Sequence, residues 1–235
     1  MRSRTRGLSL RGRTLTANSI GSALRINLIS AWRLNEASGN ATDSFGSNTL
    51  SDNNTVTSAT GLVYALARDF ERDTSEFLSI TSNASLQIGT SQSATFAAWV
   101  KAESANAFMM ILSKDGEHDL RMGAGGTELE MTDVGGAAVV STSGLNMQLA
   151  TWYFVLGWQN AAAGTINIQV DNGTVFSTSG TLAAAGTGAF QIGGRGGGNT
   201  WDGLIGPVYF WKRVLSPNER TYLYNGGAGR PFPFP

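Results

Sequence analysis

The feature that most constrains the fold is the alternation of short apolar runs with turn residues between positions 28 and 226. The clearest run is residues 151–159, in which every second residue is large and apolar: Trp152, Phe154, Leu156 and Trp158. A period of two is typical of a β-strand with one face turned to a core. Residues 94–102 show the same period, with Phe96, Ala98 and Val100 on one face and Trp99 on the other.

Turn signals separate these runs. Asp115-Gly116 and Asn172-Gly173 predict tight hairpin turns, and the second is expected to be type I′ because both residues tolerate a positive φ. The chain contains 30 glycines, so short strands are favoured over long helices. One helix is predicted near the end, where Ser216 is the N-cap, Pro217 the first helical residue and Glu219 the partner in a capping box.

About a dozen such strands joined by sequential hairpins predict an all-β fold, a two-sheet antiparallel jelly-roll sandwich with one short C-terminal helix. Each sheet is expected to have one apolar face, and the two apolar faces to bury each other. We therefore divide the chain into an extended basic arm (residues 1–27), a jelly roll (residues 28–226) and an extended C-terminal tail (residues 227–235).

The charge of the chain is strongly divided. Residues 1–35 carry seven arginines and no acid, whereas the remainder carries ten basic and seventeen acidic side chains, so the net charge is zero. Such an arm binds nucleic acid, a membrane surface or an acidic protein patch. We predict that it docks on other proteins through five arginines: Arg2, Arg4, Arg6, Arg11 and Arg13. Specific nucleic-acid binding is not expected, because no aromatic residues lie between these arginines.

Composition excludes several classes of protein. The chain has no cysteine, so disulfides and thiolate metal sites are excluded and either redox compartment is tolerated. No apolar run approaches the roughly 18 residues of a membrane span. The N-terminal residues lack the apolar core of a secretory signal, although an Arg-rich and Ser-rich start is also typical of a transit peptide.

Several motifs together resemble the LamG-like branch of the concanavalin A-like lectin/glucanase superfamily. The resemblance covers roughly residues 28–226 and rests on motifs in matching order: LISAWRLNEASGN, ATFAAWVKA, TWYFVLGWQ, INIQVDNGTV and FQIGGRGGGNTWDGLIGPVYFWKRVLSPNER. It implies a jelly roll of about 200 residues that binds glycans or proteins, often outside cells. Members include modules of adhesins, carbohydrate-active enzymes and phage structural proteins.

No catalytic residue is predicted. The single histidine, His118, lies beside a hairpin turn between two acids and is interpreted as an exposed polar tip. Glucanases of the superfamily carry E-x-D-x-x-E on one strand, and Glu128, Glu130 and Asp133 have that spacing here. Two residues depart from the pattern, and Asp133 would face opposite to the other two without a bulge. We therefore interpret this segment as an ordinary strand with a polar outer face.

Two kinds of binding site are predicted in loops. The Gly-rich segment GGRGGGNTWDG is expected to bind a sugar through Arg195, Asn199 and Trp201, with the indole ring as a stacking platform. Lectins of the superfamily often hold Ca²⁺ in loops at the sandwich edge, which requires six to eight oxygens. The predicted calcium ligands are Asp43, Asp73 and Asp202. The alternative is that these acids accept local backbone hydrogen bonds in turns, and no other cofactor is expected.

The function predicted from these features is a non-enzymatic virion surface protein, such as a phage capsid decoration, fibre or tail component. Its arm and tail would bind other virion proteins, and its lectin-like body would bind a cell-surface glycan as a homo-oligomer. Three lysines against fourteen arginines favour interface contacts over mere solubility. The alternatives are a stand-alone extracellular carbohydrate-binding or adhesion module, and a glucanase-like hydrolase.

Overall fold

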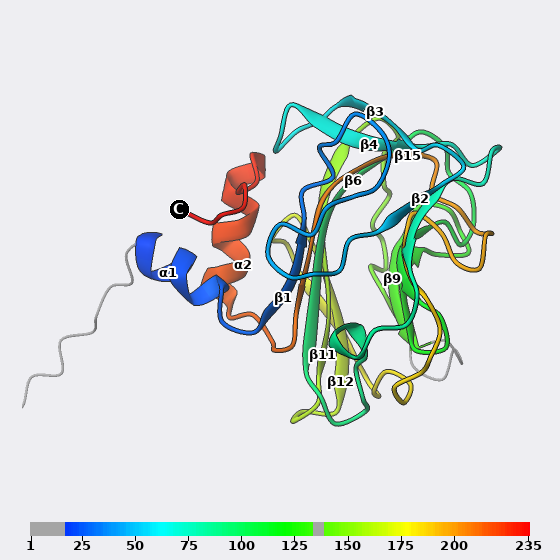
Figure 1. Ribbon diagram of the computed structural model, residues 1–235. Helices are drawn as coiled ribbons and strands as arrows, with labels where there is room; N and C mark the ends of the chain where they lie inside the picture. The colour runs from blue at the N-terminus through cyan, green and yellow to red at the C-terminus, as the bar shows by residue number, and fades with distance from the viewer. Residues whose placement is uncertain (1–16, 134–138) are drawn as a thin grey trace, which may run out of the picture.

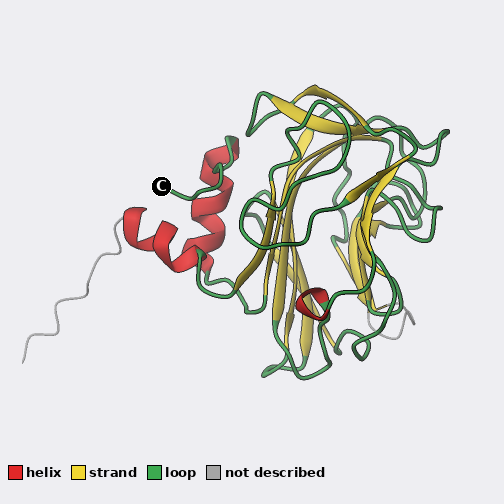
Figure 2. Cartoon of the chain, in the orientation of Figure 1, coloured by secondary structure: helices red, strands yellow, loops and turns green. Residues whose placement is uncertain are grey.

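The computed structural model describes residues 17–133 and 139–235, and these form two stacked antiparallel β-sheets with helices against one outer face (Figures 1 and 2). Every strand pair is antiparallel. The predicted jelly-roll fold class is confirmed. None of the described helices is long and apolar enough to cross a membrane.

The eight-stranded sheet has the order β13-β12-β11-β6-β15-β4-β3, and β1 also pairs with β15. Its strands are β1 (Leu28–Trp32), β3 (Thr57–Thr60), β4 (Leu66–Phe70), β6 (Ala94–Ala102), β11 (Trp152–Asn160), β12 (Thr165–Val170), β13 (Val175–Ser179) and β15 (Gly203–Trp211). β15 pairs with β4 through its first residues and with β1 through its last. The register shifts between Ile205 and Val208, where Pro207 has no backbone N–H for the ladder.

The seven-stranded sheet has the order β10-β9-β8-β7-β14-β5-β2. Its strands are β2 (Ser51–Asn53), β5 (Phe77–Ile80), β7 (Met110–Lys114), β8 (His118–Met122), β9 (Leu129–Asp133), β10 (Val139–Ser141) and β14 (Phe190–Ile192). Two single-turn 3₁₀ helices, Ala84–Leu86 and Asn225–Gly227, occur in connections. The inner faces of both sheets enclose the main core. Phe96 and Val100 of β6 lie in this core, as the alternation of residues 94–102 predicts.

A second apolar core lies on the outer face of the eight-stranded sheet. It is covered by α1 (Ala17–Leu24), α2 (Pro217–Tyr224) and the C-terminal tail, which all lie on one side of the sandwich in Figure 1. Phe154, Leu156 and Trp158 belong to this second core. The prediction that their face meets the other sheet is therefore wrong, because this sheet is apolar on both faces.

A helix replaces part of the predicted extended arm. Residues 17–24 form α1, and the indole N–H of Trp211 donates to the carbonyl of Leu24 at 2.6 Å. Arg213 donates to two carbonyls at the end of α1 and binds Glu219 through both carboxylate oxygens. Since the last carbonyls of a helix have no partner within it, these contacts hold α1 in place. The capping box of α2 is present as predicted.

The C-terminal tail also packs on the chain itself. Phe232 and Phe234 are buried in the second core, and a Cβ placed on Gly21 would lie 2.3 Å from the backbone oxygen of Pro235. The predicted extended tail, residues 227–235, therefore contributes two side chains to a core of its own chain. The five predicted docking arginines of the arm, Arg2, Arg4, Arg6, Arg11 and Arg13, lie outside the described residues.

One predicted turn shifts by a residue. The N–H of Gly173 donates to the carbonyl of Val170, and the two residues between them, Asp171 and Asn172, both have positive φ. The type I′ turn between β12 and β13 thus uses Asp171-Asn172 rather than Asn172-Gly173.

Candidate functional site

A polar row crosses the outer face of the seven-stranded sheet. In register from β2 to β9 it consists of Ser51, Ser79, Gln191, Ser113, Asp119 and Thr132. Their chain neighbours, such as Leu78, Leu112 and Leu120, point into the main core. Because successive side chains of a strand alternate between faces, this row faces away from the core.

Asp119 is the anchor of the site. Its side chain is fully buried, and its Oδ2 accepts a hydrogen bond from Nη1 of Arg195 at 2.5 Å and lies 3.7 Å from Nη1 of Arg121. Burial raises the pKa of the Asp119 carboxyl, and the two guanidinium groups oppose that rise. The other oxygen, Oδ1, has no hydrogen-bond partner among the described residues. One buried carboxylate therefore holds two arginines at the surface.

The Gly-rich loop positions Arg195 next to Asp119. Arg195 and Gly198 exchange backbone hydrogen bonds of 2.9 Å, and the two glycines between them, Gly196 and Gly197, have positive φ. This geometry is a type I′ turn, which Gly, Asn and Asp adopt far more readily than other residues. The side chain of Gln191 accepts the N–H of Gly196 at 2.7 Å and fixes the turn over the sheet.

An exposed aromatic ring lies beside the second arginine. The Arg121 guanidinium lies 4.8 Å from the centre of the Phe108 ring, and Phe108 remains 38% exposed. Phe108 has a φ of 60°, which is uncommon outside glycine and marks a constrained position. Arg121 also binds Glu130 through Nε at 3.0 Å. The side chain of Glu130 lies so close to Gly123 that a Cβ there would come within 2.6 Å of its carboxylate.

The site therefore offers a sugar both donors and acceptors. Arg195 and Arg121 are 28% and 15% exposed, and Arg195 uses only Nη1 in its described hydrogen bonds. Glu130 provides carboxylate oxygens, and Phe108 provides an apolar face. Since a sugar hydroxyl both donates and accepts hydrogen bonds, this mixture fits a polyhydroxylated ligand.

Comparison with known proteins places the chain in a family. The family model that describes the concanavalin A-like lectin/glucanases superfamily matches residues 72–219. The chain belongs to this superfamily.

Solved structures support the fold assignment. The binding domain of Paraclostridial Mosquitocidal Protein 1 has 13% identity and a TM-score of 0.69, with 87% of this chain and 53% of that chain covered. Domain 4 of AbnA, an extracellular arabinanase from Geobacillus stearothermophilus solved with arabinotriose, has 16% identity, a TM-score of 0.62, and coverage of 83% and 97%.

The botulinum neurotoxin serotype D binding domain solved with N-acetylneuraminic acid has 13% identity, a TM-score of 0.65, and coverage of 88% and 53%. This chain thus spans about half the length of the two toxin chains. At these identities the likeness shows the fold alone. No curated protein matches the sequence significantly.

The glucanase-like spacing of acids at β9 does not place all of its carboxylates on one face of the sheet. β9 pairs with β8 without a register shift, so no bulge turns Asp133 toward the outer face. Glu130 faces outward, whereas Asp133 is buried beside the main core. Glu128 accepts hydrogen bonds from Ser141 and Gly144, which lower its pKa. The predicted ordinary strand agrees with this arrangement.

His118 occupies a different position from the exposed tip that we predicted. It is fully buried on the inner face, with its ring 4.6 Å from that of Phe96, and neither ring nitrogen has a hydrogen-bond partner among the described residues. Burial lowers its pKa to about 3. The exposed-tip prediction is wrong, because the hairpin pairs His118 with Lys114 on the core side.

Of the predicted sugar-binding residues, two lie at the surface site. Arg195 and the exposed Asn199 belong to the Gly-rich loop, and the carbonyl of Asn199 accepts the N–H of Met110. Trp201 is fully buried in the main core, so its predicted role as a stacking platform is wrong. Phe108 and Arg121 were not predicted, because no local pattern shows that Phe108 would be exposed.

The predicted calcium ligands do not come together. Asp43 accepts four backbone N–H groups in its own loop and the adjacent strand: Ala31, Phe45, Gly46 and Asn48. It therefore closes a turn, which was the alternative interpretation. Asp73 is exposed, and Asp202 accepts the N–H of Arg72 at 3.3 Å.

Another group of acids could hold a cation. Among the described residues, carboxylate oxygens of Asp69, Glu71 and Glu103 lie within 4.8 Å of one another. Burial raises the pKa values of Asp69 and Glu71, and Asp202 raises both further. Calcium binding itself stays a prediction.

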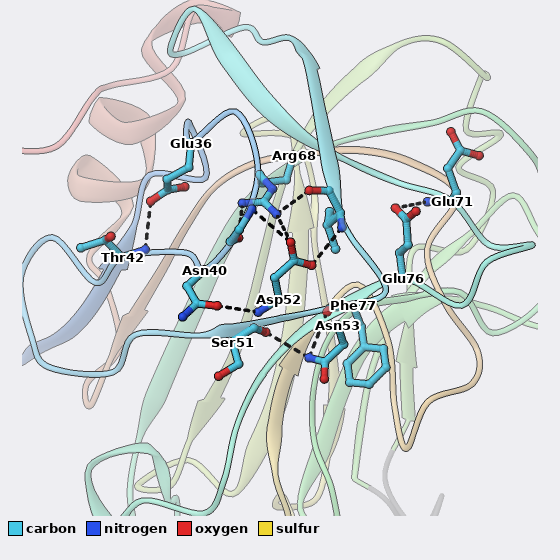
Figure 3. A network of polar contacts seen from close by, with 12 residues as sticks. Glu36, Asn40, Thr42, Ser51, Asp52, Asn53, Arg68, Glu71, Glu76 and Phe77 are labelled. Atoms are coloured by element: carbon cyan, nitrogen blue, oxygen red, sulfur yellow. Dashed lines mark hydrogen bonds and ion pairs between the residues drawn. The ribbon is translucent and has the colours of Figure 1, made fainter.

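A polar network around Arg68 has a structural role. The fully buried Arg68 donates to the carbonyls of Gly39 and Val56 and binds Asp52 at 3.3 Å (Figure 3). Figure 3 also shows Asn40 accepting the N–H of Asp52. Because these contacts tie the loop before β2, β2 itself and the β2–β3 connection to one another and to β4, this network fixes the sandwich edge rather than presenting groups to a ligand.

Proposed function

We propose that this protein is a non-enzymatic glycan-binding module, and that the glycan binds the surface formed by Phe108, Arg121, Glu130 and Arg195. The observation that carries the proposal is the buried Asp119, which holds Arg195 and Arg121 beside an exposed aromatic ring. Fixed donors lower the entropy lost on binding. Two proteins of similar fold have been solved with an arabinotriose and with N-acetylneuraminic acid, which supports a sugar as ligand.

The absence of catalysis in this proposal rests on the positions of the carboxylates. A retaining glycosidase needs two carboxyl groups about 5–5.5 Å apart facing the substrate. At the proposed surface Glu130 is the carboxylate bound to Arg121, and Asp133 faces the other way.

The test is a glycan array followed by calorimetry with the best glycan. Phe108→Ala should weaken binding by about threefold to tenfold, since an aromatic contact contributes roughly 0.5–1.5 kcal/mol. Arg195→Gln should weaken it as well, because the ion pair with Asp119 is lost. Leu149→Ala is the control, since Leu149 is also an exposed large apolar residue, at 47% against 38% for Phe108, but lies outside the site. Wild-type affinity in the Phe108→Ala/Arg195→Gln double variant would overturn the proposal.

The biological setting that we propose is the surface of a virion, with the arginine-rich residues 1–16 as the attachment segment. The support is the sequence, in which five arginines and no acid precede residue 14. Replacement of those arginines by glutamine should release the protein from its particles without altering glycan affinity. Unchanged particle occupancy would instead favour a free adhesion module.

A further inference from the structure

A basic and aromatic patch surrounds the C-terminal tail, and the tail lies on the opposite side of the sandwich from the seven-stranded sheet (Figure 1). The guanidinium groups of Arg25 and Arg33 lie 5.8 Å and 6.0 Å from the centre of the Phe232 ring. Arg33 also lies 6.0 Å from the ring of Tyr64, whose hydroxyl accepts the N–H of Phe232. Phe45 meets Phe232 edge to face at 5.9 Å.

These two arginines have no acidic partner in their own chain. Neither forms an ion pair in the part of the chain that the structure describes. The undescribed residues, 1–16 and 134–138, contain no Asp or Glu. Stacking on aromatic rings fixes the guanidinium planes but leaves their positive charge uncompensated. The Nε of Arg33 is buried and has no hydrogen-bond partner among the described residues.

The patch has the composition of an interface. Phe45, which meets Phe232, is a large apolar residue that is 41% exposed, and Ile26, the chain neighbour of Arg25, is 60% exposed. Arginine and aromatic residues are enriched in the buried centres of protein interfaces, and they carry much of the binding energy there. The partner must also supply negative charge.

The same chain carries such a negative charge elsewhere. Asp69, Glu71 and Glu103 form a group of carboxylates at the far end of β4 from Tyr64, and none of the three forms an ion pair among the described residues. β4 spans five residues, or about 17 Å at the usual rise of a strand. The patch and the carboxylate group are therefore too far apart to pair within one molecule.

We propose that the protein self-associates head to tail, with Arg25 and Arg33 of one copy binding Asp69, Glu71 and Glu103 of the next. Two different surfaces are joined in such a contact, so the assembly is a ring or a filament and not a two-fold dimer. Such an assembly carries one proposed glycan site per copy, so several sites can bind one surface together.

Sedimentation velocity over a range of protein concentrations tests the proposal. The full chain should self-associate at low salt and dissociate at high salt, because the paired charges are screened. Arg25→Glu/Arg33→Glu and Glu71→Arg/Glu103→Arg should each raise the dissociation constant at least about tenfold. An equimolar mixture of the two variants should associate again, since each reversed surface now meets an oppositely charged one.

Arg220→Glu is the matched control. Arg220 also stacks on an aromatic ring, at 4.5 Å from Trp158, and has no acidic partner among the described residues, but it does not contact Phe232. It should leave self-association unchanged. The single variant Arg25→Glu changes only an exposed residue, so it remains informative if the double variant misfolds.

A wild-type chain that stays monomeric at every concentration would overturn the proposal, as would a mixture of variants that fails to associate. Binding of the monomer to phosphatidylserine vesicles through Arg25 and Arg33 would identify a membrane surface as the occupant instead, and would also refute self-association. Glycan affinity measured on the same variants separates this proposal from the proposed function.

Discussion

Replacement of Asp43 by asparagine tests whether this residue closes a turn or binds calcium. Oδ1 accepts three backbone N–H groups at 2.9–3.0 Å, and Oδ2 accepts the N–H of Asn48 at 3.0 Å. An asparagine that keeps its oxygen toward the three donors turns its own NH₂ group toward the N–H of Asn48. Two donors then face each other in a buried position.

The magnitude follows from these four bonds. Leaving a buried donor unsatisfied costs about 1–3 kcal/mol, and the three remaining bonds lose roughly 0.5–1 kcal/mol each when the acceptor becomes neutral. Because such effects are not fully additive, we expect Asp43→Asn to lower the free energy of unfolding by about 2–4 kcal/mol. For a domain of this size the melting temperature should fall by about 5–15 °C.

The assay is thermal unfolding with and without calcium and with a chelator. The loss for Asp43→Asn should be the same in all three conditions, because no cation takes part. Asp73→Asn is the control: Asp73 is exposed, and its replacement should change stability by less than about 0.5 kcal/mol. A loss for Asp43→Asn that appears with calcium and vanishes with the chelator would refute the structural role. A melting temperature within about 1 °C of the wild type would refute the hydrogen-bond argument.

Two further predictions concern the tail and the buried histidine. Gly21→Ala should lower the melting temperature although alanine favours helices, because its Cβ would lie 2.3 Å from the oxygen of Pro235; the exposed Ser22→Ala should not, and a rise for Gly21→Ala would show that the tail does not pack on α1. The His118 imidazole should stay neutral in NMR titrations from pH 8 to pH 4, because burial lowers its pKa to about 3. Since the unfolded pKa is about 6.5, His118 contributes stability that is complete above pH 6.5 and is lost as the pH falls toward 3, so His118→Phe should reduce this acid sensitivity; a titration midpoint near 6.5 would contradict the buried position.

The strands were predictable where apolar residues alternate. β6 has Phe96 on one face and Trp99 on the other, and these lie in the main core and the second core as the alternation requires. Four strands gave no such signal because they are short, polar or both: β2, β3, β4 and β10. β2, β3 and β10 are edge strands and β4 is next to an edge, so the ladder of a neighbouring strand determines their conformation.

α1 was missed for a related reason. Residues 17–24 have no acid in the first turn and no basic residue in the last, and they include a glycine. Their helix depends on Trp211 and Arg213, which are almost two hundred residues away in the sequence. Local propensity cannot reveal a helix that tertiary contacts stabilise.

The candidate site was predictable only in part. The run of glycines in the sequence identified the loop that carries Arg195. Gly196 and Gly197 of this loop have positive φ, which few other residues adopt. No sequence pattern predicts that Phe108 is exposed, since its exposure accompanies a left-handed backbone. Trp201 lies in a polar loop, which favours exposure, but its side chain is fully buried. Burial of a loop residue depends on how the loop folds back over the sandwich.

The two cores explain how the surfaces of the molecule divide. The eight-stranded sheet is apolar on both faces, so α1, α2 and the tail must cover its outer face. That face is then closed to ligands, and its coverings bring Arg25 and Arg33 together around Phe232. The outer row of the seven-stranded sheet is polar and is contacted by the Gly-rich loop, and Phe108 and two arginines reach the surface there. The basic patch proposed for self-association and the proposed glycan site therefore lie on opposite faces, and a change in the basic patch should leave glycan binding intact.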